Sequence, residues 1–480
     1  MLRTPEQFVE DLRDGRVVYQ DGERVTDVPS LPAYRRAVEH AASEYYIALQ
    51  PENRELFNVE KDGEEYPFVY HVPKTGEDLQ RRRLIIQTLF RSAAGGTKFT
   101  GIDGLNGIAY SAKKMDLAIG TNYAEHVEDF RNYCQKHDPG IVATMTDVKG
   151  NRSLHPEDPR QAHPDFYVRI VDRSSDGIVI RGAKVHITDA IYANWLVVLP
   201  SRNHDEPAKD YAVACAVPCN AKGVIFIGTM SDQGQPGAHP MIVFDDVFVP
   251  WDKVFLAGEW QFSREVAMSF ARYHRLTAAT YKTVMLQVAA GTAMLMAEHN
   301  GLTRATRIRD MLAWLAMYAE VNEALGKAAA LDATIDPEIG LAAPNPVYTN
   351  CAKFWFAENW HQAVKYLQDI TGGLPATMPS LKDWDNPEIR PYLEKYLQGA
   401  AEYPAEERIK LMNAMNREAS SFMGLLTIHA EGSLAAQRMT VFAQADWERY
   451  KAAARHSMGL PTDHPDFKNL PTEPVYKLPE

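Results

Sequence analysis

Hydrophobic and polar positions divide the chain into three zones. Residues 1–138 place apolar side chains at helical spacing, residues 139–262 carry short β-branched runs between turn residues, and residues 263–480 return to helical spacing. This order predicts an α+β architecture with an N-terminal, mostly helical domain, a middle β-barrel or sandwich and a C-terminal helical bundle. A chain of 480 residues has room for about three such units.

Turn residues and periodicity place the predicted elements within these zones. Polar pairs at Asp21-Gly22 and Asp62-Gly63 predict loops between N-terminal helices, and the glycine-rich stretches 95–96 and 101–107 predict a connection. The predicted strands of the middle zone cover 166–171, 195–199, 211–217, 224–227 and 241–244. The predicted helices of the C-terminal zone cover 282–298, 308–331, 349–370 and 406–428.

Two motifs of the middle zone carry the most information. Between Asp176 and Asp189, β-branched residues alternate on either side of Arg181-Gly182, which predicts two strands around a turn. Earlier in the chain, the sequence Thr144-Met-Thr-Asp-Val-Lys-Gly150 predicts a short polar loop with threonines on both sides of a methionine. Taken alone, these residues describe an ordinary hairpin and loop.

Charge and cysteine content narrow the function classes. The net charge of −12 argues against broad nucleic-acid binding, because a phosphate-binding surface requires clustered Lys and Arg. The short basic run Arg81-Arg82-Arg83 precedes an apolar segment and is predicted to form a solvated helix face. Four cysteines are too few for a disulfide scaffold at this length, so reduced thiols and a cytoplasmic location are expected.

Neither a membrane span nor a secretion signal is expected. The most apolar helical stretch, Thr283 to Ala297, has about fifteen residues, fewer than the roughly 20 that span a bilayer. The first six residues, from Met1 to Glu6, show no apolar segment after a basic region. The sequence therefore predicts a soluble protein.

Several motifs in the same order resemble one flavoprotein superfamily. They are the segment from Thr4 to Val25, Ala183-Lys-Val-His-Ile-Thr188, Val243-Phe-Asp-Asp-Val-Phe-Val-Pro250 and His429-Ala-Glu-Gly-Ser433. This superfamily holds the large component of 4-hydroxyphenylacetate 3-hydroxylase and 4-hydroxybutyryl-CoA dehydratase, and its fold is acyl-CoA-dehydrogenase-like. The segment from Met145 to Leu154 looks closer to the dehydratase branch.

The resemblance implies FAD, bound between the β-domain and the helical bundle of a tetramer in which a neighbour contributes contacts. The residues that would line the flavin ring are Thr144, Met145, Thr146, His186 and Thr188. Threonine hydroxyls, loop amides and an imidazole can donate hydrogen bonds to the N5 and carbonyl region of the ring. Taken alone, His186 could instead be a strand residue that faces solvent.

A further motif, Gln368-Asp-Ile-Thr-Gly-Gly373, resembles the segment that packs on the adenine–pyrophosphate half of a neighbour's FAD. Gly372 and Gly373 let the backbone approach a phosphate closely, with amides free to bond it. A double glycine after a helix is also a common C-terminal cap. The motif alone leaves both interpretations open.

The iron–sulfur site of the dehydratase branch is not matched. That branch holds its cluster with three cysteines and one histidine, and the corresponding positions here are Gly95, Phe99, Tyr281 and His274. Thiolates are the usual ligands of such clusters, and a lone histidine cannot hold one. We therefore expect no metal, and we expect Phe99 and Tyr281 to fill the cluster cavity and line its substrate side.

The hydroxylase branch is only partly matched. Its phenol-recognising arginine, tyrosine and histidine correspond to positions near Thr100, Gly104 and Thr144. Without a cation or a phenolic donor at these positions, 4-hydroxyphenylacetate itself is a poor substrate. Hydroxylation of another compound stays open, because oxygen activation belongs to the reduced flavin and not to those residues.

Polar residues of one predicted C-terminal helix are candidates for catalysis. His274 can act as general acid or base, since an imidazole titrates near neutral pH, and Tyr281 lies two helical turns later on the same face. Arg272, Arg275 and Lys282 flank the pair and could hold a carboxylate, a phenolate or a CoA phosphate. The pair could also form a buried His–Tyr hydrogen bond in the bundle.

Glu431 lies where acyl-CoA dehydrogenases, by resemblance, carry the glutamate that removes an α-proton. In an apolar pocket the pKa of this carboxyl would rise toward a useful range. Glu431 could instead be a charge that ends a helix before Gly432. His239, in Gly237-Ala-His-Pro240, is a weaker candidate.

These features together predict a flavin-dependent monooxygenase of the two-component type, which takes FADH2 from a separate reductase and hydroxylates an aromatic or related small molecule. No GxGxxG fingerprint follows a predicted strand, which fits an enzyme that does not itself bind NAD(P)H. One alternative is a cluster-free flavoprotein that acts on an acyl-CoA thioester as isomerase, dehydratase or dehydrogenase. Another is a paralogue that carries flavin without turnover. A homotetramer and a transient reductase partner are expected.

Overall fold

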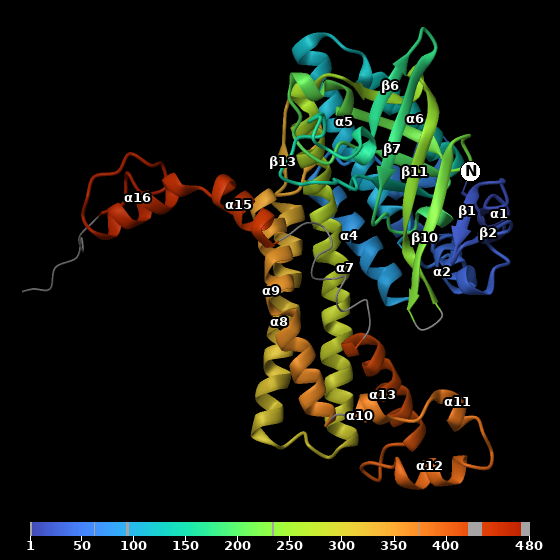
Figure 1. Ribbon diagram of the computed structural model, residues 1–480. Helices are drawn as coiled ribbons and strands as arrows, with labels where there is room; N and C mark the ends of the chain where they lie inside the picture. Colours follow the sequence, from blue (N-terminus) through green and yellow to red (C-terminus); the bar gives the residue numbers. More distant parts are fainter. Residues whose placement is uncertain are drawn as a thin grey trace, which may run out of the picture.

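The computed structural model describes residues 2–61, 63–92, 96–232, 235–372, 374–420 and 434–471. Both ends of the chain are mainly helical, and the sheets of the middle lie beside one end of the long C-terminal helices (Figure 1). One hydrophobic core joins the N-terminal helices to both sheets, and another fills the C-terminal bundle. Within these residue ranges, no helix is long and apolar enough to cross a bilayer.

The N-terminal region mixes helices with two β-hairpins. Its helices are α1 (Pro5–Glu10), α2 (Pro32–Leu49), α3 (Arg54–Phe57), α4 (Gly76–Arg91), α5 (Phe99–Ile119) and α6 (Tyr123–His137). Its strands are β1 (Val17–Gln20), β2 (Glu23–Val25), β3 (Asn58–Lys61) and β4 (Glu64–Pro67). The predicted loops at Asp21-Gly22 and Gly63 are turns, but they connect the paired strands β1–β2 and β3–β4, so the prediction of helices on either side is wrong. Asp62 lies outside the described residues.

Two sheets form the middle of the chain. The larger has the strand order β2-β1-β10-β11-β7-β6, and the smaller has the order β12-β9-β8-β5. Their remaining strands are β5 (Ile141–Thr144), β6 (Arg169–Arg173), β7 (Gly177–Lys184), β8 (Trp195–Val198), β9 (Val213–Pro218), β10 (Val224–Asp232), β11 (Gln235–Pro250) and β12 (Val254–Ala257). Each of the five predicted strands overlaps an observed one. Because β1 pairs in parallel with β10, the N-terminal zone also contributes to the larger sheet.

The segment around Arg181-Gly182 forms one strand, so the prediction of two strands around a turn is wrong. β7 runs unbroken through this pair, with β6 on one side and β11 on the other. Gly182 has a φ of +137°, and a Cβ at this position would lie 2.7 Å from the carbonyl oxygen of Tyr167. The glycine therefore permits a close approach of backbone rather than a reversal of the chain.

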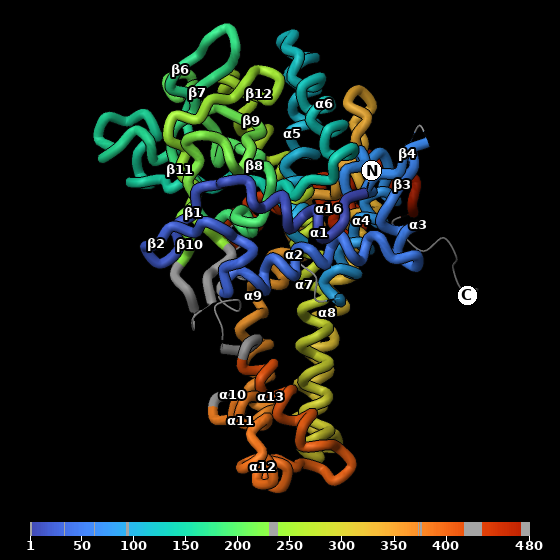
Figure 2. Tube along the Cα trace, turned by 90° about the vertical axis from the view of Figure 1, so that its right-hand side faces the viewer, coloured from blue at the N-terminus to red at the C-terminus, as the bar shows by residue number. Residues whose placement is uncertain are grey.

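The C-terminal region is a helical bundle. Its long helices α7 (Ser263–His299), α8 (Thr306–Leu331) and α9 (Pro346–Thr371) confirm three predicted helices, and α13 (Ala405–Ser420) confirms the described part of the fourth. Three short helices, α10 (Leu374–Thr377), α11 (Leu381–Trp384) and α12 (Arg390–Tyr396), lie with α13 at the end of the bundle far from the sheets (Figure 2). α15 (Leu434–Gln444) and α16 (Trp447–Ser457) form an arm that extends to one side.

The glycine-rich stretch 101–107 belongs to α5, so the prediction of a connection is wrong there. A Cβ at Gly101 would lie 2.3 Å from the backbone of Ile141, and one at Gly107 would lie 2.5 Å from the backbone nitrogen of Phe270. Glycine at these positions lets α5 pack directly on β5 and α7. The same packing brings the intervening Asp103 against α7.

The basic run of α4 is not a solvated helix face. Arg82 and Arg83 are 4% and 0% exposed. Arg82 pairs with Asp103 of α5 at 2.6 Å, and Arg83 pairs with Glu323 of α8 at 2.8 Å. Arginines are rarely buried unless they are paired, so the prediction failed because the sequence does not show these distant partners.

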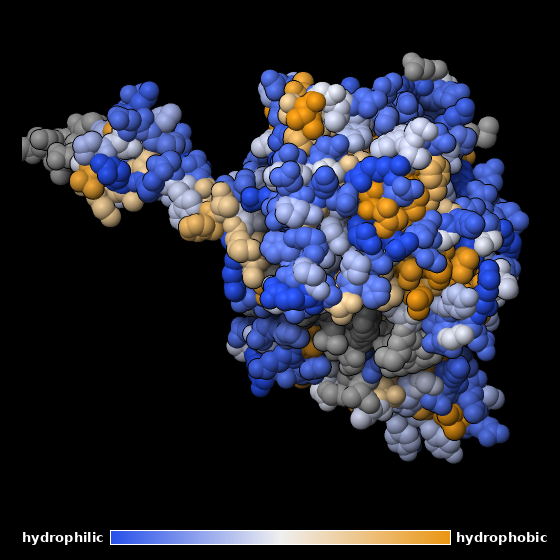
Figure 3. Space-filling view, turned by 45° about the horizontal axis from the view of Figure 1, so that its top comes forward, coloured by the Kyte–Doolittle hydropathy of each residue, from blue (hydrophilic) through white to orange (hydrophobic). Residues whose placement is uncertain are grey.

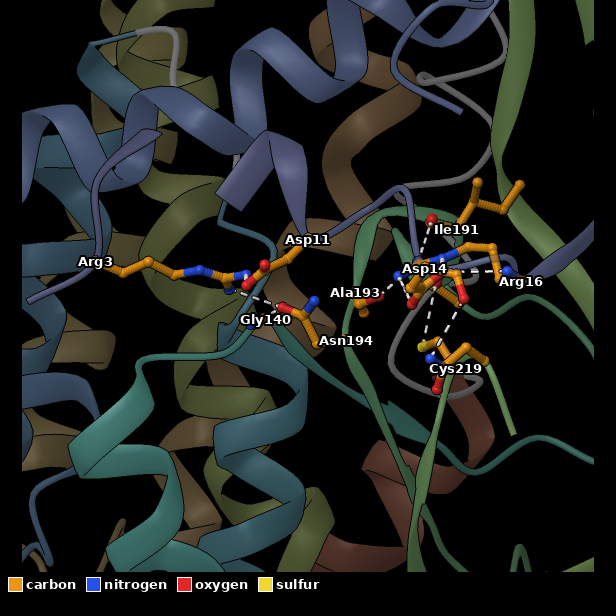
Figure 4. A network of polar contacts seen from close by, with 11 residues as sticks. Arg3, Asp11, Asp14, Arg16, Gly140, Ile191, Ala193, Asn194 and Cys219 are labelled. Atoms are coloured by element: carbon orange, nitrogen blue, oxygen red, sulfur yellow. Dashed lines mark hydrogen bonds and ion pairs between the residues drawn. The ribbon is translucent and has the colours of Figure 1, made fainter. Parts of the chain in front are cut away.

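Two arginines fasten the N-terminal segment to the beginning of β5 and β8 (Figure 4). Arg3 donates to Oδ1 of Asn194 at 2.8 Å, and the same oxygen accepts the backbone N–H of Gly140 at 2.9 Å. Arg16 donates to two backbone carbonyls just before β8, at 2.7 and 2.6 Å. These contacts fix the amino-terminal ends of the two strands.

His204 makes the stability of the fold sensitive to acid. The side chain is 3% exposed, and its Nδ1 has no hydrogen-bond partner among the described residues. Burial, with a smaller contribution from Arg202, lowers the pKa of His204 to about 4. In the unfolded chain His204 has its ordinary pKa of about 6.5 and binds a proton below that pH, whereas in the folded protein it stays neutral down to its lowered pKa. The free energy of unfolding therefore decreases as the pH is lowered from about 6.5 to the folded pKa.

We expect the free energy of unfolding to fall by about 2 kcal/mol between pH 7 and pH 5 through His204 alone. A His204→Phe variant keeps a ring beside Tyr211 but cannot bind this proton. Its free energy of unfolding should therefore fall by about 2 kcal/mol less than that of the natural protein over the same pH interval. Urea unfolding of both proteins at the two pH values measures the difference. Equal losses in the two proteins would contradict the assignment.

Candidate active site

A buried lysine fixes the loop after β5 to the end of β7. Lys184 is 1% exposed, and its Nζ lies 2.8 Å from the carbonyl oxygens of Met145 and Leu199 and 2.8 Å from Oδ1 of Asp147. Burial lowers the pKa of Lys184, and the neighbouring carboxylate of Asp147 opposes this change. Since a buried charge needs its partner, this pair holds loop and strand in one geometry.

The predicted flavin-lining residues lie on the two segments joined in this way. A backbone N–H just after β7 donates to the carbonyl of Thr146 at 2.8 Å, which places the loop beside the turn of His186 and Thr188. His186 has a φ of +61°, uncommon for a residue other than glycine, and both turn side chains are exposed. His186 faces solvent but is not a strand residue, because β7 ends at Lys184.

His239 hydrogen-bonds this turn, whereas the side chain of Thr144 points away from any ligand at the surface. The Nδ1 of His239 and the hydroxyl of Thr188 are hydrogen-bonded at 3.0 Å. Burial, with a smaller contribution from His186, lowers the pKa of His239 to about 4, so this ring is neutral at neutral pH. Thr144 is fully buried, and its hydroxyl donates to the carbonyl of Val197 at 3.2 Å. The Thr144 side chain therefore points into the protein.

His274, the predicted acid or base, belongs to a buried polar cluster between α4, α5 and α7. Its Nδ1 lies 3.0 Å from Oδ2 of Asp103, and its ring stacks on Phe270 with 4.9 Å between centroids. The other carboxylate oxygen of Asp103 accepts from Arg82 at 2.6 Å and from the Thr277 hydroxyl at 3.0 Å. The carboxylate thus orients the imidazole through one ring nitrogen and leaves the other available for proton transfer.

Aromatic side chains gather where the resemblance places cluster cysteines. Tyr281 stacks on Phe90 with 5.0 Å between centroids and an interplanar angle of 18°. A Cβ at Gly96 would lie 2.4 Å from the ring of Phe99 and 3.2 Å from that of Phe90. Phe99 is buried, and Tyr281 packs against the same core. Gly95, the third cysteine position, lies outside the described residues.

The cations predicted to hold an anion have partners inside the fold. Arg272 donates to the Thr334 hydroxyl at 2.5 Å. Arg275 is buried. Lys282 is fully buried, and its Nζ lies 5.4 Å from the ring centroid of Tyr281 and 5.0 Å from that of Phe356. The described geometry therefore does not open Arg275 or Lys282 to a ligand on the surface.

The remaining predicted site residues lie away from this cluster. Gln368 is exposed near the end of α9, and Gly372 caps that helix with a φ of +68° and an N–H donated to the Gln368 carbonyl. The cap interpretation therefore holds for Gly372 within this chain. Gly373 and Glu431, with the surrounding His429–Ser433 motif, lie outside the described residues.

A cavity of about 490 Å³ lies at the opposite end of β5 from the Met145 loop. Its lining includes Arg3, Tyr133, His137 and Trp195. Because this cavity opens at the amino-terminal ends of β5 and β8, it is separate from the candidate site.

The positions of Asp103, Arg82, Asp147 and Lys184 in the site were not predicted from the sequence. Asp103 stands between Ile102 and Gly104, and it is the one charged residue between positions 99 and 108. A charged residue in such surroundings is rarely buried without a partner, so the sequence indicated that Asp103 has a buried cationic partner. The sequence does not identify that partner as Arg82.

Comparison with known proteins defines first the fold class and then the family. The architecture resembles that of a glutaryl-coenzyme A dehydrogenase complex, with a TM-score of 0.50 over 95% of both chains and 13% identity, which shows the acyl-CoA-dehydrogenase-like fold alone. Family models for the N-terminal and C-terminal parts of 4-hydroxyphenylacetate 3-hydroxylase match residues 4–256 and 263–459. The chain belongs to the 4-hydroxyphenylacetate 3-hydroxylase family.

Relatives from both branches match nearly the whole chain. The 4-hydroxybutyryl-CoA dehydratase/vinylacetyl-CoA-Δ-isomerase of Clostridium aminobutyricum is 29% identical over 96% of this chain and 100% of its own. The oxygenase component of 4-hydroxyphenylacetate 3-monooxygenase from Thermus thermophilus is 28% identical over 86% of this chain and 87% of its own.

Solved structures give the same two branches. An oxygen-tolerant 4-hydroxybutyryl-CoA dehydratase from N. maritimus has a TM-score of 0.89, with 27% identity and 96% of each chain covered. A 4-hydroxyphenylacetate 3-monooxygenase oxygenase component, solved with FAD and 4-hydroxyphenylacetate, has a TM-score of 0.85, with 25% identity over 95% of this chain and 98% of its own.

Proposed function

We propose that this chain is the FAD-dependent oxygenase of a two-component monooxygenase, which receives FADH2 from a separate reductase and hydroxylates a phenol or related small molecule. The observation that supports this reaction over cluster-assisted dehydration is the aromatic packing of Phe90, Phe99 and Tyr281. Phenyl and phenol side chains offer no thiolate to iron. Relatives whose names describe FADH2-dependent or phenol monooxygenases support the same choice.

The donor set at the loop and turn fits a flavin ring. The ring offers carbonyl oxygens and nitrogens as acceptors, and Thr146, His186 and Thr188 supply hydroxyl and imidazole donors at a partly exposed position. Lys184 holds the Met145 carbonyl at 2.8 Å, so the loop is ordered before a ligand binds. We propose that these residues bind the isoalloxazine ring.

Reduced FAD, when bound, supplies the activation of molecular oxygen. The protein supplies position and proton transfer. His274 accepts the proton of the substrate hydroxyl group, and the phenyl rings of Phe90 and Phe99 together with Tyr281 form an apolar wall that excludes water. We further propose that charge around the site is adjusted by Arg275, Lys282 and Glu431. The FAD of a neighbouring subunit would be contacted by Gln368, Gly372 and Gly373.

The arm formed by α15 and α16 supports a homo-oligomer, which we propose to be a tetramer. Large apolar side chains on the arm face solvent in the single chain, among them Phe442 and Met458, which are 70% and 71% exposed. The base of the arm, α15, packs against α9, and Figure 3 shows the outer part of the arm projecting from the rest of the molecule. Such exposure on a projecting element marks a surface that packs on another protein.

A charged residue on the arm should weaken the assembly. We expect a Met439→Glu/Phe442→Glu variant to shift from tetramer toward smaller species, because each glutamate would be buried unpaired at the interface. Light scattering after gel filtration measures the mass, and Gln444→Glu is the matched control on the same helix. An unchanged mass for the double variant would exclude this face of α15 from the interface.

An acyl-CoA thioester is the second candidate substrate class. It is supported by the 29% identity to the dehydratase over that protein's full length. Under either reaction the buried free thiols Cys134, Cys215 and Cys219 support a reducing, cytoplasmic setting.

The two functions are separated by turnover with chemically reduced FAD in air. The monooxygenase proposal predicts a hydroxylated product from at least one member of a panel of phenols, and less than 0.1 iron per chain (about one-fortieth of a four-iron cluster). Conversion of a CoA thioester without oxygen, or stoichiometric iron and sulfide, would overturn it.

A further inference from the structure

Asp103 is the buried centre of the polar cluster around His274. The residue is 0% exposed, and its carboxylate is met by donors from two other helices. Arg82 of α4 donates to Oδ1 at 2.6 Å, and the Thr277 hydroxyl of α7 donates to the same oxygen at 3.0 Å. Oδ2 is left to face Nδ1 of His274 at 3.0 Å.

The partners of this carboxylate determine where the imidazole proton lies. An ionised carboxylate only accepts hydrogen bonds, and the guanidinium of Arg82 keeps Asp103 in a charged pair. The contact with Oδ2 therefore requires a proton on Nδ1 of His274. In the neutral ring the remaining nitrogen, Nε2, then carries the free electron pair.

We infer that Asp103 is a positioning residue that fixes the Nδ1–H tautomer of His274, so that Nε2 is the base that accepts the substrate's proton. This inference rests on the proposed function for the identity of the proton donor, a phenolic O–H. The O–H bond breaks, its electron pair stays on the substrate oxygen, and an N–H bond forms at Nε2. The resulting imidazolium is stabilised by the negative charge of Asp103 at 3.0 Å.

An isosteric substitution reverses this arrangement. In Asp103→Asn, Arg82 and Thr277 still donate to the position of Oδ1, so the amide oxygen occupies it and the amide NH2 replaces Oδ2. The NH2 group then donates to Nδ1, which moves the ring proton to Nε2 and removes the base. We expect kcat to fall by about 10²- to 10⁴-fold while KM changes by less than about fivefold.

The tautomer is measured by solid-state ¹⁵N NMR of histidine-labelled holoprotein, with the His274 signals assigned by their loss in His274→Gln. The expected result is a protonated Nδ1 in the natural protein and a protonated Nε2 in Asp103→Asn. Thr280→Val is the matched control, because it removes another buried hydroxyl of α7, one that donates to the Leu276 carbonyl, and it should keep the natural tautomer.

A protonated Nε2 in the natural protein would overturn the inference, and so would an unchanged tautomer in Asp103→Asn. The first of these results does not depend on Asp103→Asn, so it decides the matter even if that variant does not fold. The tautomer is read without substrate. A protonated Nδ1 together with failure to hydroxylate any phenol would therefore count against the proposed function and leave the role of Asp103 standing.

Discussion

Replacement of Lys184 by methionine is expected to lower the free energy of unfolding by about 3–5 kcal/mol and to weaken FAD binding by about tenfold or more. Lys184 contacts Met145, Leu199 and Asp147, each at 2.8 Å, and methionine keeps only the aliphatic volume. The substitution leaves the Asp147 carboxylate buried without its cation and releases the loop that we propose to hold the flavin. Chemical denaturation and fluorescence titration with FAD measure the two effects.

Two controls separate the buried pair from a general loss of lysine. Lys222→Met removes an exposed lysine of the same region and should change neither quantity. Lys184→Met/Asp147→Asn removes both charges and should recover most of the lost stability, because no unpaired charge remains. If the single substitution costs less than about 1 kcal/mol and leaves FAD affinity unchanged, the proposed role of Lys184 is wrong.

Replacement of His274 by glutamine is expected to lower turnover by about 10²- to 10⁴-fold, the usual contribution of a general base. Glutamine preserves hydrogen-bonding capacity toward Asp103 but has no basic nitrogen. FAD binding should stay within about threefold of the natural protein, because the proposed ring contacts come from the Met145 loop and the His186 turn. Steady-state kinetics with supplied FADH2 measure turnover, and fluorescence titration measures binding.

The matched control is His126→Gln, since His126 is a half-buried histidine that hydrogen-bonds the Val254 carbonyl away from the site. It should retain turnover within a few-fold of the natural protein. Equal losses in both variants would indicate a general effect of histidine removal on folding. A fully active His274→Gln protein would remove His274 from the mechanism.

The fold could be predicted from the sequence where local pattern decides the structure. Short β-branched runs predicted the five strands, and helical spacing predicted α7, α8 and α9, because the apolar pattern that forms each element lies within its own length. The prediction failed where a distant contact sets the role of a residue. Gly101 and Gly107 look like a connection until Ile141 and Phe270 are seen to pack against their backbone.

In the candidate site too, residues within local motifs could be predicted from the sequence, and residues defined by distant contacts could not. His274 was identified by resemblance and by its chemistry, and the loop of Met145 and turn of His186 were recognised as a motif pair. Their supports, Asp103 and Lys184, depend on partners that lie far away in sequence, since Asp103 to His274 spans 171 positions and Lys184 to Met145 spans 39. Sequence spacing within one helix or strand carries no information about such pairs.

Rapid mixing of the reduced, FAD-loaded protein with oxygen distinguishes a monooxygenase from an acyl-CoA enzyme. In the presence of a phenolic substrate and ¹⁸O₂, we expect one labelled oxygen atom to enter the product for each flavin reoxidised, with hydrogen peroxide as a minor product. Immediate reoxidation that releases one equivalent of hydrogen peroxide and no labelled product with any phenol, alongside flavin spectral changes on addition of a CoA thioester without oxygen, would contradict this expectation.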